Sequence, residues 1–333
     1  MEIEIYAPVM IPTLCRYDTF RRCVDSLSKC TGADQTELFI GIDYPSKEDH
    51  WEGYRQICAY VEKLKGFKTI HIYKRETNYG QVKNTRSLAD EVRKRFDRYI
   101  LSEDDNEFSP NFLEYINKGL EKYKNDPDVI SICGYNFPFD YMENIKGYEK
   151  NAYPIQYYSA WGAGYWREKR IMVINFINND KAKEIVFSWP AVFKLWKAGH
   201  YSTVRRLLSR YKTGIGDLMY RIYCVFENKY CIFPAVSKVR NLGNEGNGTI
   251  CEIVDHRYAN QKIDTNLTFE YNDFEIKNYK PIQKACRKLS SFDKKNFYMI
   301  PFSIFEYVWF RISGKPFDIK PLVKKYRHVL KRD

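Results

Sequence analysis

Residues 98–108 read RYILSEDDNEF, and this stretch decides the fold class. Its apolar run, 99–101, is followed by three consecutive acids, Glu103, Asp104 and Asp105. A short apolar run bounded by polar residues is typical of a buried strand. Open α/β sheets bind ligands beyond the carboxyl ends of their strands, and carboxylates at that place suit Mg²⁺ or Mn²⁺. An isolated acidic turn is more often only solvated, so the interpretation depends on the neighbouring segments.

Strand-like and helix-like segments alternate around this stretch. Strands are expected at 3–11, 36–43, 68–74, 99–101 and 129–133, and helices at 18–30, 48–65, 81–96 and 110–123, the last with Ser109 as N-cap. Such alternation predicts an α/β fold with a mostly parallel central sheet flanked by helices. Neither G-x-G-x-x-G after the first strand nor G-x-x-x-x-G-K-[ST] occurs, which disfavours a nicotinamide dehydrogenase and a P-loop NTPase. A nucleotide bound here would therefore be held by a metal ion and side chains.

The chain after residue 135 has a different character. Residues 157–167 (YYSAWGAGYWR) are aromatic and rich in glycine, which is typical either of a ligand-binding segment or of a buried hairpin. Asp217 precedes a helix expected at 218–228 and is a candidate N-cap. Residues 237–249 can wrap a diphosphate or form an ordinary turn. The basic residues expected on a solvated helical face are Arg205, Arg206, Arg210 and Lys212.

The composition indicates a folded protein with an anionic partner. The 333 residues carry a net charge of +12 and 17% aromatic residues, which suits a phosphorylated ligand, a nucleic acid or an acidic membrane. Nine cysteines without a C-x-x-C pair argue against a zinc site and favour reduced thiols in a cytoplasmic protein. The N-terminus enters a strand directly, so no signal peptide is expected. Residues 296–312, followed by Lys and Arg residues, predict either an interfacial helix on the inner face of a membrane or a helix that covers the main domain.

Several motifs occur in one order along the chain. They are Pro12-Thr13 with Arg16, Asp43, Asn78-x-Gly80, the acids at 103–105, Ser159-x-Trp161-Gly162, Asp217 and Asn241-x-Gly243. Over roughly residues 3–264 this order resembles the GT-A-fold (Rossmann-like) glycosyltransferases, especially the bacterial family 2 enzymes of polysaccharide and capsule assembly. The acidic segment is also similar to that of Golgi N-acetylglucosaminyltransferase I. The resemblance implies a domain at 1–270, with a nucleotide-sugar half at 1–135 and an acceptor and catalytic half at 136–270. A basic, aromatic, helical and membrane-associating extension would follow at 271–333.

The resemblance also implies an activity. The chain would be an inverting glycosyltransferase that moves a sugar from a nucleotide-diphosphate sugar, with a UDP-sugar favoured, to a hydroxyl of a glycan or lipid-linked oligosaccharide in surface polysaccharide synthesis. Asp217 would be the general base, and Asp105 would hold Mn²⁺ or Mg²⁺. Related sequences often carry a metal-binding His where this chain has Ile250, and His256 is the substitute candidate. The expected nucleotide-sugar-binding residues are Pro12, Thr13, Arg16, Asp43, Asn78, Gly80, Lys83, Arg86, Glu103, Asp104, Trp161, Gly162, Lys238, Arg240 and Asn241.

Two other classes compete with this interpretation. A sugar nucleotidyltransferase also uses acids and Mg²⁺ on an α/β sheet, but such enzymes usually carry a glycine-rich loop after the first strand, and residues 10–16 contain no glycine. A non-enzymatic nucleic-acid-binding protein would need basic residues interleaved with exposed aromatic residues on one face. Here the basic excess lies in the C-terminal third beside an apolar stretch. No nucleic-acid partner is therefore expected.

Overall fold

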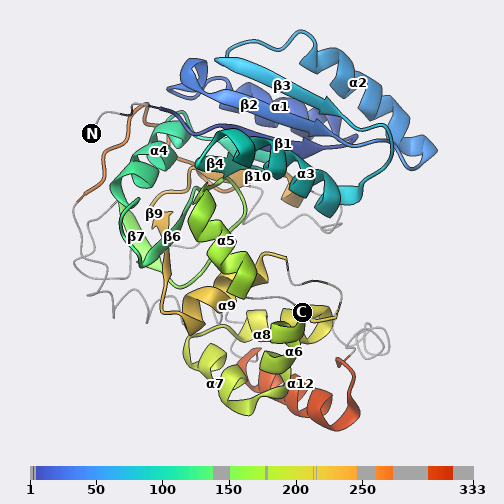
Figure 1. The fold of residues 1–333 in the computed structure, drawn as a ribbon, viewed down its shortest axis with the longest axis vertical. Coiled ribbons are helices and arrows are strands. Elements are labelled where there is room, and N and C mark those ends of the chain that lie inside the picture. Colours follow the sequence, from blue (N-terminus) through green and yellow to red (C-terminus); the bar gives the residue numbers. More distant parts are fainter. Residues whose placement is uncertain are drawn as a thin grey trace, which may run out of the picture.

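A computed structural model describes residues 3, 5–137, 151–176, 179–212, 214, 216–245, 260–272 and 299–317. An eight-stranded sheet crosses its upper part in the order β3-β2-β1-β4-β8-β6-β9-β7 (Figure 1). Only β8 and β7 run against the other strands. The strands are β1 (Val9–Thr13), β2 (Glu37–Ile42), β3 (Thr69–Lys74), β4 (Arg98–Leu101), β6 (Val129–Cys133), β7 (Ala152–Ile155), β8 (Ala163–Trp166) and β9 (Tyr230–Pro234). This arrangement confirms the predicted fold class, an α/β protein with a mostly parallel central sheet.

Helices cover both faces of the sheet, and the side-chain alternation of the strands explains why. Along β1, Val9 and Ile11 lie in one hydrophobic core, whereas Met10 lies in another. Because successive strand residues point to opposite faces, the two cores lie on opposite sides of the sheet. α1 (Tyr17–Leu27), α2 (Trp51–Val61) and α4 (Phe112–Lys122) contribute to the first core, and α3 (Gly80–Arg95) and α9 (Leu218–Phe226) to the second.

The strand order reverses beside β1. From β1 the chain proceeds outward to β2 and β3, and it then returns to β4 on the other side of β1. Met10 pairs with Leu101, and Thr13 pairs with Ile42 on the opposite neighbour. Open α/β sheets bind their ligands in the crevice that such a reversal opens at the carboxyl ends of the strands. The acids that follow β4 begin at this crevice.

A separate unit of helices lies below the sheet in Figure 1. It contains α6 (Asn179–Phe187), α7 (Trp189–Lys197), α8 (Tyr201–Arg210) and α12 (Met299–Ser313), whereas α5 (Arg167–Phe176) packs on the sheet with Val173 in the second core. A third core joins α6, α7, α8 and α9 to α12, whose Tyr307 and Phe310 are fully buried. Trp196 Nε1 donates a hydrogen bond of 3.2 Å to Ser303 Oγ, and Arg205 pairs with Glu306. The C-terminal helix is therefore packed against α8 along one of its faces.

One helix, α4 (Phe112–Lys122), begins later than the sequence predicts, because strand pairing keeps the preceding residues extended. Residues 109–111 precede α4, and Asn111, rather than Ser109, occupies the N-cap position. The cause is a small antiparallel pair formed by β5 (Asn106–Phe108) and β10 (Val239–Asn241). Ser109 N donates to Lys238 O at 2.9 Å and continues this pair, so the backbone stays extended past the predicted start.

None of the helices in the described ranges is both long and apolar enough to span a bilayer.

Candidate active site at the carboxyl edge of the sheet

The end of β1 and the turn after β4 bring three buried polar side chains together. Thr13 is the last residue of β1, and its hydroxyl donates to Asp104 Oδ2 at 2.8 Å. Asp104 is 7% exposed and Asp105 is 6% exposed, so both carboxylates are removed from bulk water. Burial raises the pKa of Asp104, although the charge of Arg16 opposes this shift. Two adjacent buried carboxylates need a positive partner to remain charged.

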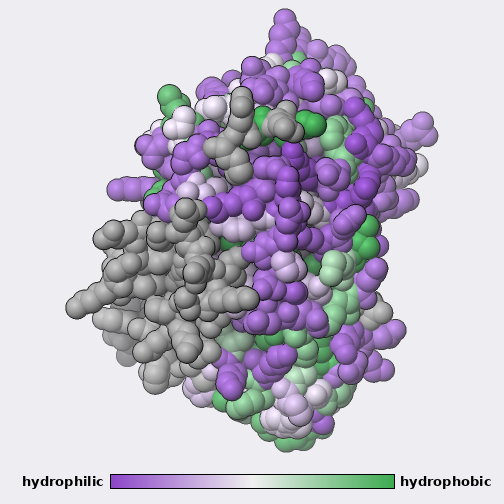
Figure 2. Space-filling view, turned by 60° about the vertical axis from the view of Figure 1, so that its left-hand side comes forward, coloured by the Kyte–Doolittle hydropathy of each residue, from purple (hydrophilic) through white to green (hydrophobic). Residues whose placement is uncertain are grey.

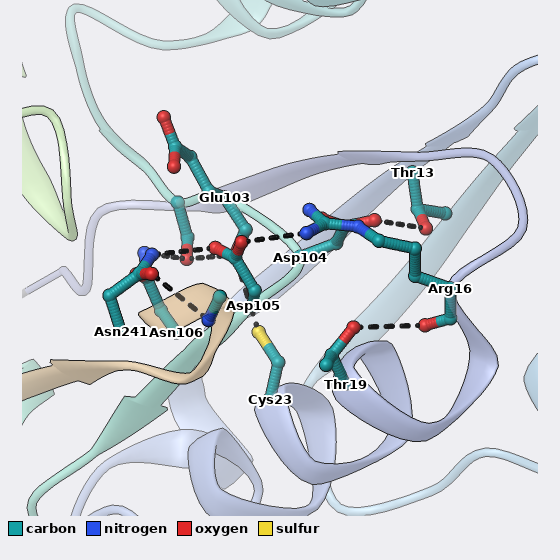
Figure 3. Close-up of polar contacts among 11 residues, drawn as sticks. Thr13, Arg16, Thr19, Cys23, Glu103, Asp104, Asp105, Asn106 and Asn241 are labelled. Atoms are coloured by element: carbon teal, nitrogen blue, oxygen red, sulfur yellow. Dashed lines mark hydrogen bonds and ion pairs between the residues drawn. The ribbon is translucent and has the colours of Figure 1, made fainter. Parts of the chain in front are cut away.

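Arg16 is that partner in the structure. Its guanidinium lies between the two carboxylates, where Nη1 contacts Asp105 Oδ2 at 2.8 Å and Nη2 contacts Asp104 Oδ1 (Figure 3). Burial by itself lowers the pKa of Arg16, but the charges of Asp104 and Asp105 outweigh it, and the pKa is raised. Arg16 therefore remains cationic and compensates half of the charge of the acid pair.

The second half of the chain completes the cluster through β10. Asn241 Nδ2 donates to Asp105 Oδ1 at 2.7 Å, and Asn241 Oδ1 accepts from Gly243 N at 3.0 Å. A Cβ atom at Gly243 would lie 2.7 Å from Asp105 Oδ2, which is closer than real Cβ contacts. Only glycine at this position therefore leaves the space beside that carboxylate oxygen open. A spare volume next to a buried carboxylate is what a metal ligand requires.

Glu103 differs from its two neighbours. Its carboxylate is half-buried and points away from Asp104 and Asp105 in Figure 3. Burial raises the pKa of Glu103 to about 8, and the charges of Asp105 and Asp104 add to the shift. The negative charge of Asp217 adds a smaller upward shift to the pKa of Glu103.

Asp217 occupies the N-cap position of α9, but its side chain does not cap the helix. Instead, its carboxylate accepts from Arg206 Nη2 at 3.1 Å and from Arg221 Nη2 at 3.4 Å. The prediction of a solvated basic face is wrong for Arg205, which pairs with buried Glu306, whereas the Arg206 side chain remains 39% exposed beside Asp217. Sequence reasoning missed Arg221, although residues four apart on a helix are neighbours, and the i, i+4 spacing from Asp217 is a usable signal.

The residues expected around the nucleotide lie after β2 and before α3. Asp43 is buried, and its Oδ1 accepts from Tyr44 N at 2.9 Å and from Tyr79 N at 2.7 Å. Asn78 Nδ2 donates to Tyr44 O, and Gly80 adopts a φ of +72° at the start of α3. The remaining members of this expected set are half-buried Pro12 and exposed Lys83 and Arg86, and Lys83 Nζ lies 3.9 Å from the Tyr79 ring centre. Asp43 thus orders the loop that leads into α3, whereas Pro12 lies on β1, and Lys83 and Arg86 lie within α3 itself.

Trp161 and Gly162 lie at the turn before β8. Gly162 has a φ of +63°, and a Cβ atom there would lie 2.8 Å from the Val239 side chain. Its carbonyl accepts from Gly134 N at 2.8 Å. Trp161 is partly buried and packs edge-on against Tyr135 with 4.6 Å between ring centres. The close contact between Gly162 and Val239 thus holds this turn against β10, the strand that ends at Asn241.

Lys238 and Arg240, which were expected to bind the diphosphate, instead form ion pairs within the protein. Lys238 is 1% exposed, pairs with Asp264 and packs against Phe269. It is therefore a buried structural residue and not an accessible ligand of a diphosphate, which corrects the prediction. Arg240 pairs with Glu107, its Nε lying 2.9 Å from Glu107 Oε2, so its charge is already compensated. Ile250 and His256 lie outside the described residues.

The donor set suits a divalent cation that is shared with phosphates. Over the described part of the chain, no three His, Cys, Asp or Glu side chains converge to form a closed metal site. Mg²⁺ and Mn²⁺ accept carboxylate oxygens, and Mg²⁺ is usually held by one or two carboxylates with substrate phosphates and water. Asp105, with the space beside it that Gly243 leaves open, fits this mode of binding.

Comparisons with known proteins give distant matches. No family model matches the chain, and no curated protein does. The mannosyltransferase PcManGT from Pyrobaculum calidifontis, solved with GDP-Man and Mn²⁺, has 12% identity and a TM-score of 0.41, covering 99% of this chain and 84% of its own. A crystal structure of S. aureus TarS has 16% identity and a TM-score of 0.31, covering 40% of this chain and 22% of TarS. Both TM-scores are below 0.5, and the function proposed below therefore rests on the geometry of the site.

Proposed function

We propose that this protein is a glycosyltransferase that uses a nucleotide-diphosphate sugar. The observation that carries the proposal is the convergence of Asp104, Asp105 and Asn241 at the crevice where the strand order reverses. Residues 1–135 supply the acids and the loop ordered by Asp43, and residues 136–270 supply Asn241 and Asp217. A nucleotide sugar needs such a two-sided site, because one half must hold the nucleotide while the other half presents the acceptor.

The first chemical requirement is to stabilise the departing diphosphate. Asp105 would hold Mn²⁺ or Mg²⁺, and such an ion acts as a Lewis acid toward phosphate oxygens when it is bound. Asn241 orients the Asp105 carboxylate through its 2.7 Å hydrogen bond, and Thr13 orients Asp104 in the same way. Arg16 supplies a guanidinium whose planar geometry matches phosphate as well as carboxylate. The nucleotide itself would lie against Asp43 and the loop before α3.

The second requirement is to remove a proton from the acceptor hydroxyl. Asp217 is the proposed general base, since it comes from the opposite half of the chain and its negative charge acts on Glu103 in the acidic cluster. Arg206 and Arg221 hold its carboxylate in position. The site uses Asp217 as a base and no carboxylate as a covalent nucleophile. We therefore propose single displacement with inversion at the anomeric carbon.

The proposed substrates follow from the same residues and from the charge of the chain. A UDP-sugar is the favoured sugar donor, and a glycan or lipid-linked oligosaccharide of surface polysaccharide synthesis is the favoured acceptor. The net charge of +12 supports an anionic partner, and a nucleotide diphosphate is one. Trp161 supports a sugar substrate, because aromatic rings offer flat apolar surfaces on which sugar rings can pack.

An apolar surface on the helical unit supports a peripheral position on an anionic membrane in the cytoplasm. We call it the α7/α12 surface. It consists of the exposed side chains of Phe187, Trp189, Phe193, Ile304, Phe305, Val308, Trp309 and Ile312. Figure 2 shows hydrophobic side chains gathered at the lower end of the molecule, where α7 and α12 lie in Figure 1. Soluble monomers rarely expose patches of this kind, and the sequence after α12 carries seven Lys and Arg residues at positions 315–332. A bilayer of anionic lipid offers both the apolar and the charged complement.

A binding screen tests the proposed function. Thermal unfolding of the full chain would be followed with Mn²⁺ and UDP-, GDP-, CMP- or dTDP-sugars, and separately with a single-stranded oligonucleotide. We expect stabilisation by one class of nucleotide sugar that depends on Mn²⁺, and no stabilisation by the oligonucleotide. Incubation of the stabilising sugar donor with candidate acceptors, followed by NMR of the product, would then give the anomeric configuration. Stabilisation by the oligonucleotide alone would contradict the proposal, and a product with retained configuration would contradict the single-displacement mechanism.

A further inference from the structure

Every carboxylate oxygen of the acid pair already has a protein partner. Asp104 Oδ2 accepts from Thr13, Asp105 Oδ1 accepts from Asn241, and Arg16 takes the remaining oxygen of each (Figure 3). A Cβ atom at residue 243 would lie 2.7 Å from Asp105 Oδ2, so this side of the carboxylate is unobstructed only because the residue is glycine. A cation that binds Asp105 Oδ2 would share this oxygen with the Arg16 guanidinium, and the repulsion between the two positive charges favours displacement of the guanidinium.

The Arg16 side chain can leave Asp104 and Asp105 without a change in the backbone of the site. Its backbone belongs to the start of α1, where Arg16 O accepts from Phe20 N at 3.0 Å and from Thr19 Oγ1 at 3.1 Å. Its side chain is 29% exposed, while those of Asp104 and Asp105 are 9% and 8% exposed. The guanidinium can therefore swing outward by side-chain rotation alone, whereas the carboxylates remain fixed by Thr13 and Asn241.

The charges make the exchange conditional on the nucleotide. Arg16 contributes one positive charge to a pair of acids with two negative charges, and a divalent cation would neutralise the pair completely. A bound cation by itself would leave Arg16 without an anionic partner, at the cost of two charge-assisted hydrogen bonds. A diphosphate that arrives together with the cation offers Arg16 new acceptor oxygens of matching geometry. Cation and nucleotide should therefore bind with positive coupling, which acts equally in both directions.

We propose that Arg16 is an exchangeable counter-ion, which holds Asp104 and Asp105 until a divalent cation and a nucleotide diphosphate bind together, and which then passes from the carboxylates to the diphosphate. This inference rests on the proposed function, because it requires that a metal and a diphosphate meet at this site. It assigns Arg16 a role that ordinary nucleotide contact would not require. Arg16 makes the binding of metal in the absence of nucleotide unfavourable.

The test measures Mn²⁺ binding rather than turnover. Free Mn²⁺ would be followed by electron paramagnetic resonance in titrations of the full chain, with and without saturating UDP or GDP. The variants are Arg16→Met, which removes the charge and keeps a long side chain, and Arg21→Met as the matched control. Arg21 lies on the same helix, is 57% exposed and pairs with Asp25 away from the acid cluster. Circular dichroism would verify that each variant is folded.

If Arg16 is exchanged in this way, Arg16→Met should change the affinity for Mn²⁺ and the affinity for the nucleotide in opposite directions. In the absence of nucleotide, Arg16→Met should bind Mn²⁺ about tenfold or more tightly than the wild type, because no guanidinium has to be displaced. With saturating Mn²⁺, the same variant should bind UDP or GDP about tenfold less tightly, so that the coupling between the two ligands falls. Arg21→Met should match the wild type in both titrations. If Arg16→Met does not fold, Arg16→Lys, which keeps the charge but loses the planar fork, must still bind Mn²⁺ more tightly than the wild type.

The outcomes separate this inference from the proposed function. If the wild type binds Mn²⁺ with UDP or GDP, but Arg16→Met binds Mn²⁺ alone with unchanged or weaker affinity, the exchange is overturned and the proposed function stands. If the wild type binds no Mn²⁺ even with either nucleotide, the metal at Asp105 is wrong and the exchange fails with it. Tighter Mn²⁺ binding by Arg16→Met together with weaker nucleotide binding supports both.

Discussion

The side-chain amide of Asn241 donates a hydrogen bond of 2.7 Å to Asp105, although 136 positions separate the two residues. Asn241 ends β10, and β10 pairs with β5, which begins directly after Asp105. The acid proposed to hold the metal is thus oriented by the half of the chain that also carries Asp217. This contact links the two halves of the site and motivates the first prediction.

Gly243→Ala should weaken binding of the metal–nucleotide pair. The added Cβ atom would lie 2.7 Å from Asp105 Oδ2 and 3.0 Å from Asn241 Oδ1, so the acid or the β10 segment must shift. We expect the Mn²⁺-dependent affinity for UDP, measured by isothermal titration calorimetry, to fall about tenfold or more, since one displaced carboxylate ligand is lost. An unchanged affinity would show that the space beside Asp105 is not used.

Asp217→Asn should reduce the turnover number and leave binding of the sugar donor intact. Asparagine is isosteric with aspartate but cannot accept the proton, and loss of a general base typically costs about 10²–10⁴-fold in rate. The measurements are kcat for glycosyl transfer and the dissociation constant of the nucleotide sugar. Asp128→Asn is the control, because Asp128 pairs with Lys229 at the amino ends of β6 and β9, away from the site at the carboxyl ends of the strands. Near-normal turnover of Asp217→Asn would remove Asp217 from the role of base.

Removal of divalent cations should abolish transfer reversibly. A chelator takes away the Lewis acid proposed to stabilise the leaving diphosphate, and Mn²⁺ or Mg²⁺ in excess should restore the activity. Asp105→Asn keeps the shape of the side chain but loses its charge, and we expect this variant not to recover on addition of either ion. Full activity of the wild type in chelator, with no residual metal by elemental analysis, would refute a metal-dependent mechanism.

The α7/α12 surface should bind anionic vesicles. We expect the full chain to sediment with vesicles that contain phosphatidylglycerol and to remain in solution with pure phosphatidylcholine. The double variant Trp309→Glu/Ile312→Glu places charge on this surface, and the bound fraction should fall about fivefold or more, because apolar burial is replaced by a charge at the interface. Met172→Glu/Ile174→Glu on α5 changes two other exposed apolar side chains and serves as the control. Equal losses in both double variants would contradict a specific membrane surface, and dimerisation through α12 would appear as a doubled mass in solution.

His200 should make the fold sensitive to acid. Burial lowers the pKa of His200 to about 4, and the charge of Arg221 adds to the shift, so the ring is neutral in the folded protein. The unfolded chain binds a proton near pH 6.5, and stability is therefore lost as the pH falls from about 6.5 to about 4. The contribution is about 3 kcal/mol when the shift is converted at about 1.4 kcal/mol per pKa unit. In urea unfolding, His200→Gln should show a smaller loss of stability over this range than the wild type, and an equal loss would contradict the prediction.

The local pattern of the chain was sufficient to place most elements but not all of their ends. The expected strand at 68–74 and the observed β3, Thr69–Lys74, agree within one residue, because the alternation of apolar side chains is a local property. The expected strand at 3–11 begins only at Val9, and α4 begins at Phe112 rather than after Ser109. In the second case the pairing of β5 with β10 determines where the helix starts, and that partner is distant in sequence.

The residues of the candidate site were likewise predictable from the sequence only in part. Arg16, Asp104 and Asn241 were expected near one nucleotide because of the family resemblance, and the structure brings all three together with Asp105. The pattern did not show that Lys238 turns inward to Asp264. Basic residues in a Gly- and Asn-rich segment suggest phosphate binding from composition alone, whereas the direction of each side chain depends on how β10 lies against β5.

The sequence by itself determined the class of fold and the position of the acids after the fourth strand. Strand and helix periodicities, the missing glycine motifs and the order of polar residues are all carried by neighbouring positions. Only the tertiary structure decided that Arg16 bridges acids 88 and 89 positions away and that Asn241 closes the cluster. The physical reason is that buried charges require compensation, and in this site the compensating partners come from elements that become adjacent only when the sheet order is complete.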